Sequence, residues 1–584
     1  MLRRLSVASL LLLPVLIATS SAAEPLPPPA RWIPRDAIFT VEVLQPKAIL
    51  DLAFDSRVTR LVASLPAYQA MLSQEGPQGL LKLVEFLAAR FDSDRKTLLT
   101  KLVGGGVTFA VGARGEALLV VDAQDEEVLQ QIAEIVTNIA KDEAAKRGQS
   151  AQIESAQYQG VAVWKSGNKE AHAIVGKRLL VSNRAETLKM ALDLRTAADG
   201  ESLAATPAYQ AARKAVGDNA QAMAFVNFAA IKNVPRVEKA LSDISSPVPV
   251  LAIAGMTEAL RHSSWLALAL RVAGDQLGIE MRMDGKAPEG SLVTAFSQSP
   301  RSQDGVFPNL IVPRRIAAVS LYRDVYKFYA AKDQLFPERT SGLIFFENMM
   351  GIFFSGRNLT EDVLSQLEPE IRVVIARQEY GAAGGPPMVQ IPSFAVVMRL
   401  RHPQEFGEVA EEAFQKALGV VTLQSGQKGM SGLIIDRSTY HDVRYTVAYF
   451  TAPASPDRDY RDARHNYRPT LAKLGDYLVL SSTEDLARDL IDALKREMAS
   501  PVTPVAGVHS LVELDVVQAI AAADANRKSL VRQSMAKNGI GEAEAAAKYD
   551  MLTTLTKQLG QATLKIGAQE GQFRAGLQFQ LNLK

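Results

Sequence analysis

The sequence predicts an α+β protein made of two tandem repeats, each an antiparallel sheet with amphipathic helices packed on one face. A strand–turn–helix pattern at residues 176–193 returns at 475–492, an offset of 299 without a gap. The identical pairs are Gly176/Gly475, Leu179/Leu478, Ser182/Ser481 and Asp193/Asp492. A repeat of this kind indicates that one supersecondary unit has been duplicated.

A second alignment, at an offset of 278, supports the same fold. The helix that begins at Pro403 has seven apolar positions up to Leu418, and six of the seven positions that match them between Val128 and Ala140 are also apolar. This spacing follows one face of an α-helix, so both helices are predicted to bury the same face. The physical pattern is therefore repeated even where identities are sparse.

The first 23 residues predict an export signal. Arg3 and Arg4 precede an apolar run from Leu5 to Ile17, and Ser21-Ala22-Ala23 supplies small residues before a cut ahead of Glu24. The alternative is an uncleaved membrane anchor, but the apolar run is shorter than the ~20 residues that a spanning helix needs. Residues 24–31 then form a proline-rich leader.

Composition restricts the function. Removing residues 1–23 takes away Arg3 and Arg4 and no acid, so 65 basic residues become 63, equal to the 63 acidic ones. A neutral chain argues against a nucleic-acid partner, which requires a basic face. The chain has no cysteine, which excludes disulfides, thiol catalysis and thiolate metal sites. We expect a periplasmic or secreted protein with no transmembrane span once the signal is removed.

The first repeat is predicted over residues 32–284. It opens with a strand at Ala37–Val43, followed by a helical region to about Leu102, and the turn chemistry of Ala113-Arg114-Gly115 predicts a hairpin after that. Asp122 is predicted to cap the next helix, because acidic residues follow it. The remaining predicted elements are strands at 160–164, 172–182 and 223–228, a helix at 186–194, mostly helix over 229–262, and a hairpin of strands 265–272 and 277–283.

A Gly-, Ser- and Pro-rich linker is predicted at 285–308, before a second repeat at 309–584. Val312-Pro313-Arg314 matches Ile33-Pro34-Arg35, and the strand at Gly507–Leu514 matches that at Met223–Phe228. Two insertions, 381–391 and 455–467, distinguish the second repeat. Its other predicted elements are a strand at 395–398, helices between 516 and 559, and a closing hairpin of 564–568 and 572–581.

This layout resembles exported bacterial proteins that carry a domain of unknown function. The features that carry the resemblance are the signal, the Pro-led first strand at Ile33-Pro34-Arg35-Asp36, the strand at Gly176–Ser182 and the helix that follows it. The resemblance covers most of the chain after the signal. It implies tandem α+β repeats and no particular activity.

The sequence gives little evidence for a metal site. No two of the six histidines, His172, His262, His402, His441, His465 and His509, lie three to five residues apart, so no helical or finger-type pair exists. Asp457, Asp459 and Asp462 have the alternating spacing of a calcium loop, but Arg458, Arg461 and Arg464 between and beside them neutralise their field. A solvated hairpin loop is the better interpretation, and no metal or cofactor is predicted.

The sequence also gives little evidence for a catalytic site. Ser182 and Ser481 recur at matched positions, but a serine at a strand-to-helix turn most simply caps the helix, and no histidine recurs with them. The Gly104-Gly105-Gly106 triplet precedes a strand and lacks a following Lys-Ser/Thr, so it predicts a turn and not a phosphate loop. The Asn358-Leu359-Thr360 sequon is interpreted as accidental.

These observations favour a non-enzymatic exported protein that binds or scaffolds in the cell envelope, with the second-repeat insertions as recognition elements. The partner would be an envelope protein or a ligand. Two alternatives stay open. One is an envelope hydrolase whose site is assembled from distant residues. The other is a carrier of an apolar ligand, which requires an internal cavity between sheet and helices.

Overall fold

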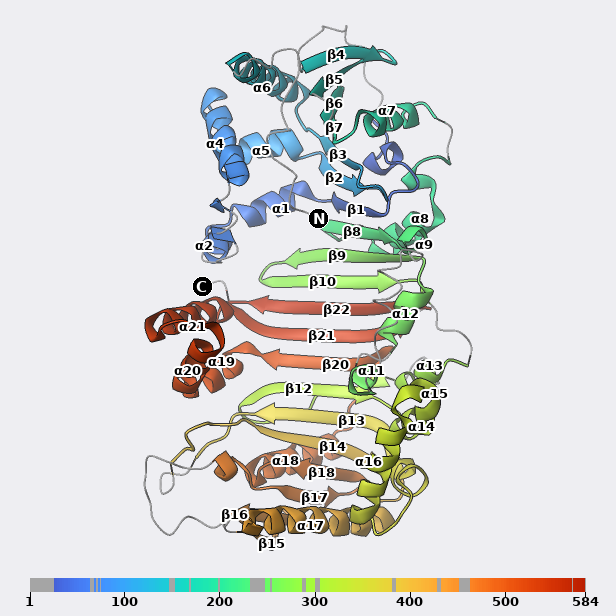
Figure 1. The fold of residues 1–584 in the computed structure, drawn as a ribbon, viewed down its shortest axis with the longest axis vertical. Coiled ribbons are helices and arrows are strands. Elements are labelled where there is room, and N and C mark those ends of the chain that lie inside the picture. The colour runs from blue at the N-terminus through green and yellow to red at the C-terminus, as the bar shows by residue number, and fades with distance from the viewer. Residues whose placement is uncertain are drawn as a thin grey trace. The chain divides into compact units, whose positions relative to one another are not determined.

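The computed structural model describes residues 26–582 apart from 64–67, 70–71, 74, 147–152, 167–169, 198–199, 232–246, 253–254, 286–289, 300–304, 381–384, 428–431, 451–462 and 570. These residues form two compact units. The first unit comprises the described residues up to 240 together with 263–284, and the second comprises those of 241–262 and 285–582. Each unit combines helices with antiparallel strands and is therefore α+β (Figure 1). In the described part of the chain, every helix is too short or too polar to cross a membrane.

The first unit contains ten strands whose neighbours all pair antiparallel. Their spatial order is β4 (Ile153–Tyr158), β5 (Val161–Ser166), β6 (Glu170–Val175), β7 (Arg178–Ser182), β3 (Ala117–Asp122), β2 (Gly106–Val111), β1 (Phe39–Val43), β8 (Ala222–Asn227), β9 (Trp265–Ala273) and β10 (Gln276–Met283).

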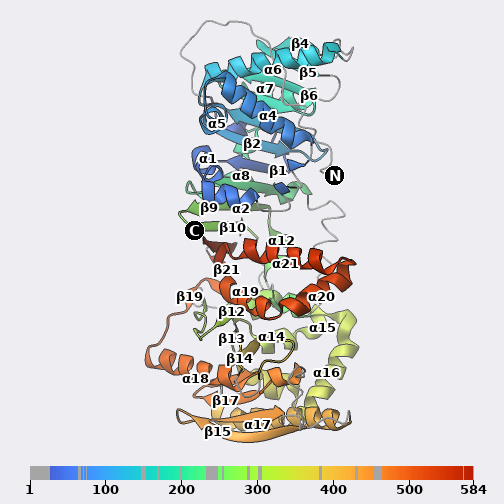
Figure 2. The same cartoon turned by 90° about the vertical axis from the view of Figure 1, so that its left-hand side faces the viewer.

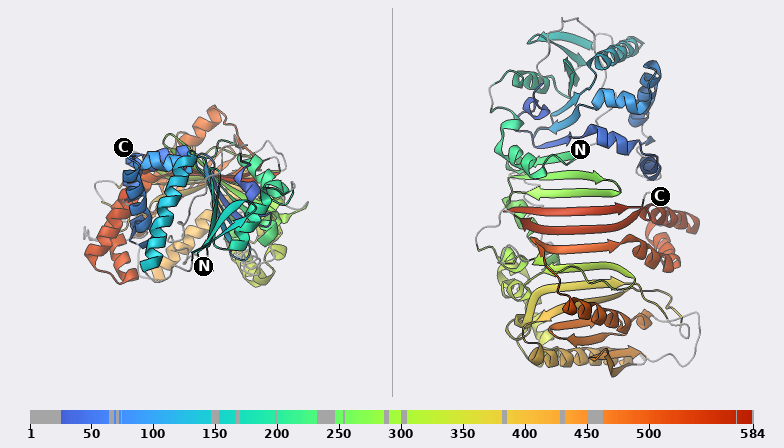
Figure 3. Two further views of the ribbon diagram at one scale, coloured as in Figure 1. Left: turned by 90° about the horizontal axis from the view of Figure 1, so that it is seen from above. Right: turned by 180° about the vertical axis from the view of Figure 1, so that it is seen from behind.

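The corresponding run of the second unit is also antiparallel throughout (Figure 3). Its order is β15 (Leu433–Tyr440), β16 (Val443–Phe450), β17 (Thr470–Leu474), β18 (Tyr477–Ser481), β14 (Ser393–Leu400), β13 (Leu367–Ala376), β12 (Arg315–Tyr322), β20 (Val508–Asp515), β21 (Leu559–Gln569) and β22 (Gln572–Leu581). A separate pair joins β11 (Gly305–Val306) to β19 (Val505–Ala506). Counted along the chain, the ten strands of each main run are ordered in the same way.

The helices connect these strands at corresponding places in the two units. The first unit has α1 (Pro46–Ala53), α2 (Ser56–Ala63), α4 (Glu75–Arg90), α5 (Arg95–Val103), α6 (Glu126–Lys146), α7 (Ala185–Leu194), α8 (Pro207–Val216) and α9 (Phe228–Ile231), with short 3-10 turns η2 (Pro29–Trp32) and η4 (Leu203–Ala205). The second has α11 (Pro247–Ala252), α12 (Met256–His262), α13 (Leu292–Ser297), α14 (Val325–Ala330), α15 (Lys332–Leu335), α16 (Thr340–Phe353), α17 (Pro403–Gln427), α18 (Glu484–Ala499), α19 (Val516–Ala525), α20 (Arg527–Asn538) and α21 (Glu542–Thr556), with short turns η5 (Pro337–Arg339), η6 (Leu359–Val363), η7 (Leu364–Gln366) and η8 (Ala463–Asn466).

Helices cover both faces of the sheet in the second unit, so the prediction that they pack on one face is wrong there. Successive side chains of a strand point to opposite faces. On β17, Leu471 joins a buried cluster with Phe406 of α17, whereas the next residue, Ala472, joins a different cluster with Leu490 of α18. The sheet is thus buried on two sides, which also explains why β18 reads as a continuous apolar run, Leu478-Val479-Leu480.

The prediction that Asp122 caps a helix is also wrong. β3 extends through Asp122, whose carboxylate accepts two hydrogen bonds from the Arg178 guanidinium, at 2.6 Å from Nε and 2.7 Å from Nη2. The cap is Asp125, which accepts the backbone N–H of Val128 at 3.1 Å. Two acids of one short stretch therefore have separate roles, one in an ion pair inside the unit and one at the start of α6.

The strand predicted at His172–Ser182 is a hairpin of β6 and β7, because Gly176 adopts a left-handed φ of 55° and turns the chain. Gly475 does the same with a φ of 56°, between β17 and β18. Left-handed backbone is the conformation that glycine adopts without strain. The two identical glycines therefore specify the same turn.

Residues 247–252 and 255–262, which precede β9, belong to the second unit, and packing explains why for Val250 and Leu251. Val250 and Leu251 pack against a cluster of Phe296, Phe328 and Phe336. The buried Arg323 donates from Nε to the carbonyl of Leu251 at 2.6 Å. A chain segment that precedes β9 is thus anchored beside α13 and α14.

Candidate functional site: an apolar pocket in the second unit

The second unit contains a pocket of about 490 Å³, lined mainly by apolar side chains. This volume is within the range of small-molecule sites, about 300–1,000 Å³. The pocket is bounded by one sheet face, by the C-terminal half of α17 and by the chain around η8. Its lining is Phe394, Val396, Leu418, Val421, Gln424, Ser425, Leu433, Phe450, Arg464, Tyr467, Pro469, Leu480, Ser481 and Ser482.

The sheet supplies one wall through the alternation of two paired strands. Phe394 and Val396 of β14 point to the pocket, and Leu480 of β18 pairs with Val396 across the ladder. The residues between them, Ala395 and Val479, point to the opposite face and are buried completely. The pocket therefore occupies the same face that α17 covers with Phe406 nearer its N-terminus.

α17 supplies the opposite wall. Leu418, Val421 and Ser425 are spaced i, i+3 and i+7, so they lie on one side of the helix. The hydroxyl of Thr422 accepts the backbone N–H of Leu433 at 3.3 Å, which ties the start of β15 to the helix. Leu433 in turn pairs with Phe450 at the end of β16, and both side chains line the pocket.

Asn466 holds the remaining wall in place and joins the two insertions that the sequence singled out. Its Oδ1 accepts from the backbone N–H of Ile391 at 2.9 Å, and its Nδ2 donates to the carbonyl of Val389 at 2.9 Å. Its Oδ1 also accepts the Tyr380 hydroxyl at 2.7 Å. Burial raises the pKa of Tyr380 to about 12, so this hydroxyl stays a donor near neutral pH. The described ends of both insertions thus meet at a side chain that is 1% exposed.

Arg464 and Tyr467 are the polar groups that Asn466 positions at the pocket. The Arg464 guanidinium lies 5.1 Å from the centre of the Phe450 ring, a cation–π contact. Ser482 is already used, because its Oγ accepts the backbone N–H of Phe394 at 2.8 Å. The pocket consequently combines apolar walls with one cationic side chain, which suits a ligand with an apolar body and an anionic group.

Three of the large apolar side chains in the lining are exposed. The exposed fractions are 47% for Phe394, 41% for Val421 and 40% for Leu480. Large apolar side chains from three different elements that converge on one pocket are typical of a ligand site. The individual residues were missed in the sequence, although the apolar run at Leu478-Val479-Leu480 indicates burial on both faces.

The first unit has a cavity of similar size, about 480 Å³, but of different chemistry. Its lining includes Asp36, Arg114, Glu116, Arg184 and Glu186 beside apolar residues. Opposed charges around one space neutralise each other and are solvated at the surface. This cavity offers a less suitable environment for an apolar body than the pocket of the second unit.

The two repeated serines hold the turns between strand and helix. Ser182 Oγ donates to the carbonyl of Ala117 at 2.8 Å and accepts the N–H of Arg184 at 3.2 Å. Ser481 Oγ donates to the carbonyl of Thr483 at 2.7 Å and accepts its N–H at 3.2 Å. Both hydroxyls therefore bond to backbone two residues ahead, and the helix caps themselves are Arg184 and Thr483.

The histidines are dispersed. His172 and His509 are buried on β6 and β20. On the surface, His402 Nδ1 lies 2.8 Å from Gln366 Oε1, and His441 lies in the β15–β16 turn, 3.8 Å from Asp492. Among the described residues, no three His, Asp or Glu side chains gather as metal ligands would. Asp457, Asp459 and Asp462 lie outside the described residues.

The glycine triplet and the sequon have structural roles. The Gly104–Gly106 triplet forms the predicted turn from α5 to β2, and Asn358 caps η6 through Oδ1.

Comparison with known proteins adds no assignment. No family model matches the chain, and no curated protein matches it. Among solved structures, crystal forms III, IV and I of TP0453 are similar at 10%, 9% and 10% identity, with TM-scores of 0.23, 0.22 and 0.23. They cover 45%, 44% and 44% of this chain and 80%, 80% and 78% of the other. A likeness of this size carries no argument about fold or function.

Proposed function

We propose that this chain is an exported cell-envelope protein that acts by binding, and that its ligand is an amphiphile with an apolar body and an anionic head. The observation that carries the proposal is the pocket between the sheet face and α17, with Arg464 on its wall. Of the alternatives open from sequence, this one required a cavity between sheet and helices.

The energetics favour an apolar ligand. Fully burying one Phe, Leu or Val side chain is worth about 1.5–3 kcal/mol, so covering the half-open Phe394, Val421 and Leu480 contributes on the order of 1 kcal/mol each. An anionic head would lie beside the Arg464 guanidinium, where hydrogen bonds to an ionised group are stronger than neutral ones. The free energy of binding is the sum of these contributions less the cost of association, which is the freedom of motion that both partners lose.

Catalysis draws less support. A serine hydrolase needs a hydroxyl within reach of a base, and the hydroxyls of Ser182 and Ser481 are bonded to backbone atoms. Ser481 lines the pocket, but its hydroxyl already donates a hydrogen bond to the backbone carbonyl of Thr483. Among the described residues that line the pocket there is no histidine, aspartate or glutamate. An envelope hydrolase therefore remains the second candidate.

The two-repeat architecture is part of the same proposal. It is supported by the equal strand order in the two units and by the matched left-handed turns at Gly176 and Gly475. In this scheme the described end of the 455–467 insertion supplies Arg464 and Tyr467 to the pocket of the second copy, and Asn466 bonds it to the 381–391 insertion. Export to the periplasm or the exterior would bring that copy into contact with envelope amphiphiles.

The proposal is tested with a dansyl-labelled fatty acid as the probe and the chain from Glu24 to Lys584. We expect saturable enhancement of dansyl fluorescence, displaced by palmitate more strongly than by hexadecanol, which lacks the anionic head. Val421→Trp should abolish binding by filling the pocket from α17. Arg464→Gln should weaken palmitate by about tenfold or more and leave hexadecanol unchanged.

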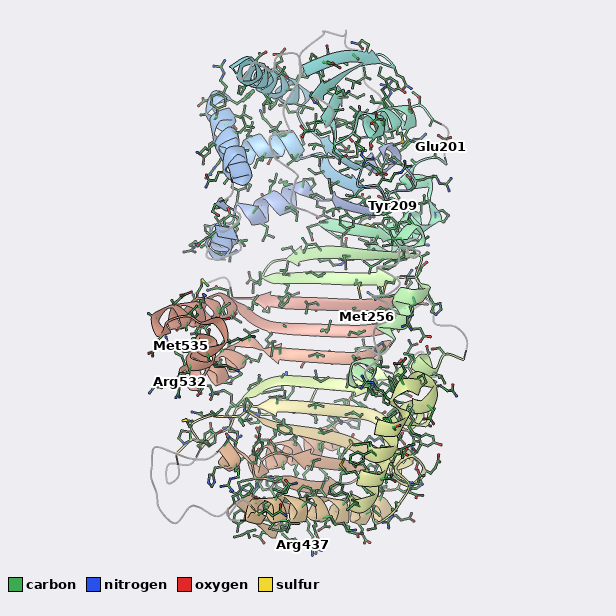
Figure 4. The ribbon with its side chains drawn as sticks, viewed as in Figure 1. Glu201, Tyr209, Met256, Arg437, Arg532 and Met535 are labelled. Carbon is green, nitrogen blue, oxygen red and sulfur yellow. The ribbon has the colours of Figure 1, made fainter. Side chains whose placement is uncertain are left out.

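Arg532→Gln, on the exposed side of α20, is the matched control and should bind as the parent chain does (Figure 4). Circular dichroism checks that each variant is folded. Equal binding by the parent and Val421→Trp would overturn the assignment of this pocket, and absence of any saturable binding would overturn the proposed ligand class.

A further inference from the structure

The helix α16 exposes five large apolar side chains. Phe345 and Ile352 are 70% and 68% exposed, and Ile344, Phe346 and Met349 are exposed as well. The helix lies along the outer side of the second unit in two perpendicular views (Figures 1 and 2). Exposed apolar residues are common one at a time, but five large ones within nine residues form a patch that needs an occupant.

The inner side of α16 holds the one charged residue of the helix. Glu347 is partly buried and pairs with Lys332 at 3.2 Å. Leu343 and Met350, one turn before and one turn after it, pack against the cluster around Leu359 and Phe406. The helix is thus apolar on both its inner and its outer side, whereas an ordinary surface helix directs polar and charged residues to water. The outward face of α16 is therefore suited to an apolar environment.

The ends of the helix indicate which environment. Arg339 directly precedes the helix, and Arg357 follows it by four residues; both side chains are exposed. Arginines at the ends of an apolar helix can lay their stems along it and place the guanidinium beside anionic lipid headgroups. With 14 residues α16 is roughly 21 Å long, too short for the ~30 Å hydrocarbon core of a bilayer. It can lie in the membrane interface and cannot span it.

We propose that α16 docks the second unit on the surface of an anionic phospholipid bilayer. Phe345, Met349 and Ile352, spaced i, i+4 and i+7, enter the boundary between headgroups and acyl chains. Arg339 and Arg357 contact lipid phosphates at the two ends. This surface is separate from the pocket lining, and its test requires no pocket ligand.

The experiment is sedimentation of the chain from Glu24 to Lys584 with vesicles of phosphatidylcholine alone or mixed with phosphatidylglycerol. We expect binding to the mixed vesicles that weakens as salt is raised. Phe345→Gln with Ile352→Gln should weaken it by about tenfold or more. Arg339→Gln with Arg357→Gln should lower binding to the mixed vesicles and reduce its salt dependence.

Val517→Gln with Leu552→Gln is the matched control, because it removes two similarly exposed apolar residues from α19 and α21. The control should bind as the parent does, and circular dichroism should report the same fold in every variant. Equal loss in the control and the α16 variant would overturn the proposal. So would absence of binding to mixed vesicles, or self-association of the parent in sedimentation velocity that the Phe345/Ile352 variant abolishes, since the occupant would then be a second copy.

Discussion

His172 is a buried base that the fold keeps neutral. It lies on β6 opposite Trp164 of β5, and within the described structure its Nε2 has no hydrogen-bond partner. Burial lowers the pKa of His172 to about 4. Burial, with Arg323 nearby, likewise lowers the pKa of His509 to about 3. Both residues therefore contribute to the pH dependence of stability.

The sign of this dependence follows from linkage. The unfolded chain binds a proton on each histidine below about pH 6.5, whereas the folded chain does not bind one until about pH 4 or lower. The free energy of unfolding should therefore fall as pH drops through this window, by about 1.4 kcal/mol per pH unit for each histidine. His172→Gln should reduce the slope by this amount, as measured by urea unfolding between about pH 7 and pH 5. The exposed His262→Gln is the control, and an unchanged slope in His172→Gln would contradict the prediction.

Two buried arginines are each paired with a carboxylate. The Arg178–Asp122 pair in the first unit and the Arg372–Glu497 pair in the second each have two short hydrogen bonds, at 2.6 Å and 2.7 Å and at 2.6 Å and 2.8 Å. Tyr209, which is labelled in Figure 4, donates a hydrogen bond to the carboxylate of Glu42. Burial raises the pKa of that carboxyl. A buried ion without such partners is costly, so these residues specify the packing of their neighbours.

The strand–turn–helix element shows how a single backbone position matters. Gly176 and Gly475 turn their hairpins with left-handed φ values of 55° and 56°. A Cβ at Gly176 would have its nearest neighbour, Glu126 Oε2, at 3.9 Å, which is ordinary contact. The cost of a side chain there is therefore conformational and not steric.

We expect Gly176→Val to lower the free energy of unfolding by roughly 1–2 kcal/mol, because a β-branched residue is strained in this region. Gly176→Asn should cost less, because asparagine tolerates the left-handed conformation. Chemical unfolding of the two variants beside the parent measures the difference. Equal stability of the Val and Asn variants would show that the turn does not require this conformation.

At the scale of the whole molecule, the prediction of export can be tested by its N-terminus. If residues 1–23 are a cleaved signal, protein from the periplasm of a bacterial host should begin at Glu24, as determined by mass spectrometry. Ala23→Arg should block processing, because the signal peptidase requires a small residue before the cut. Recovery of the parent with Met1 intact in the membrane fraction would favour the uncleaved anchor.

Much of the secondary structure could be predicted from local pattern. The hairpins at residues 106–122 and 265–283, the helices α6 and α17 and the closing hairpin follow from apolar periodicity and turn residues. The prediction failed at Asp122, because its local sequence fits both a strand residue and a helix cap. Its hydrogen bond with the distant Arg178 places it in the strand. It also merged β6 and β7, because apolar residues continue on both sides of Gly176.

The sequence by itself determined the α+β class, the repeated strand–turn–helix element and the absence of disulfides, because these depend on residues close together in the chain or on composition alone. Only the tertiary structure decided that helices cover both faces of the second unit's sheet, that Asn466 joins two insertions about 75 residues apart, and that α16 exposes five large apolar side chains. Each of these depends on which distant segments pack together. Local hydrophobic periodicity shows which face of an element is buried, but not which segment packs against that face.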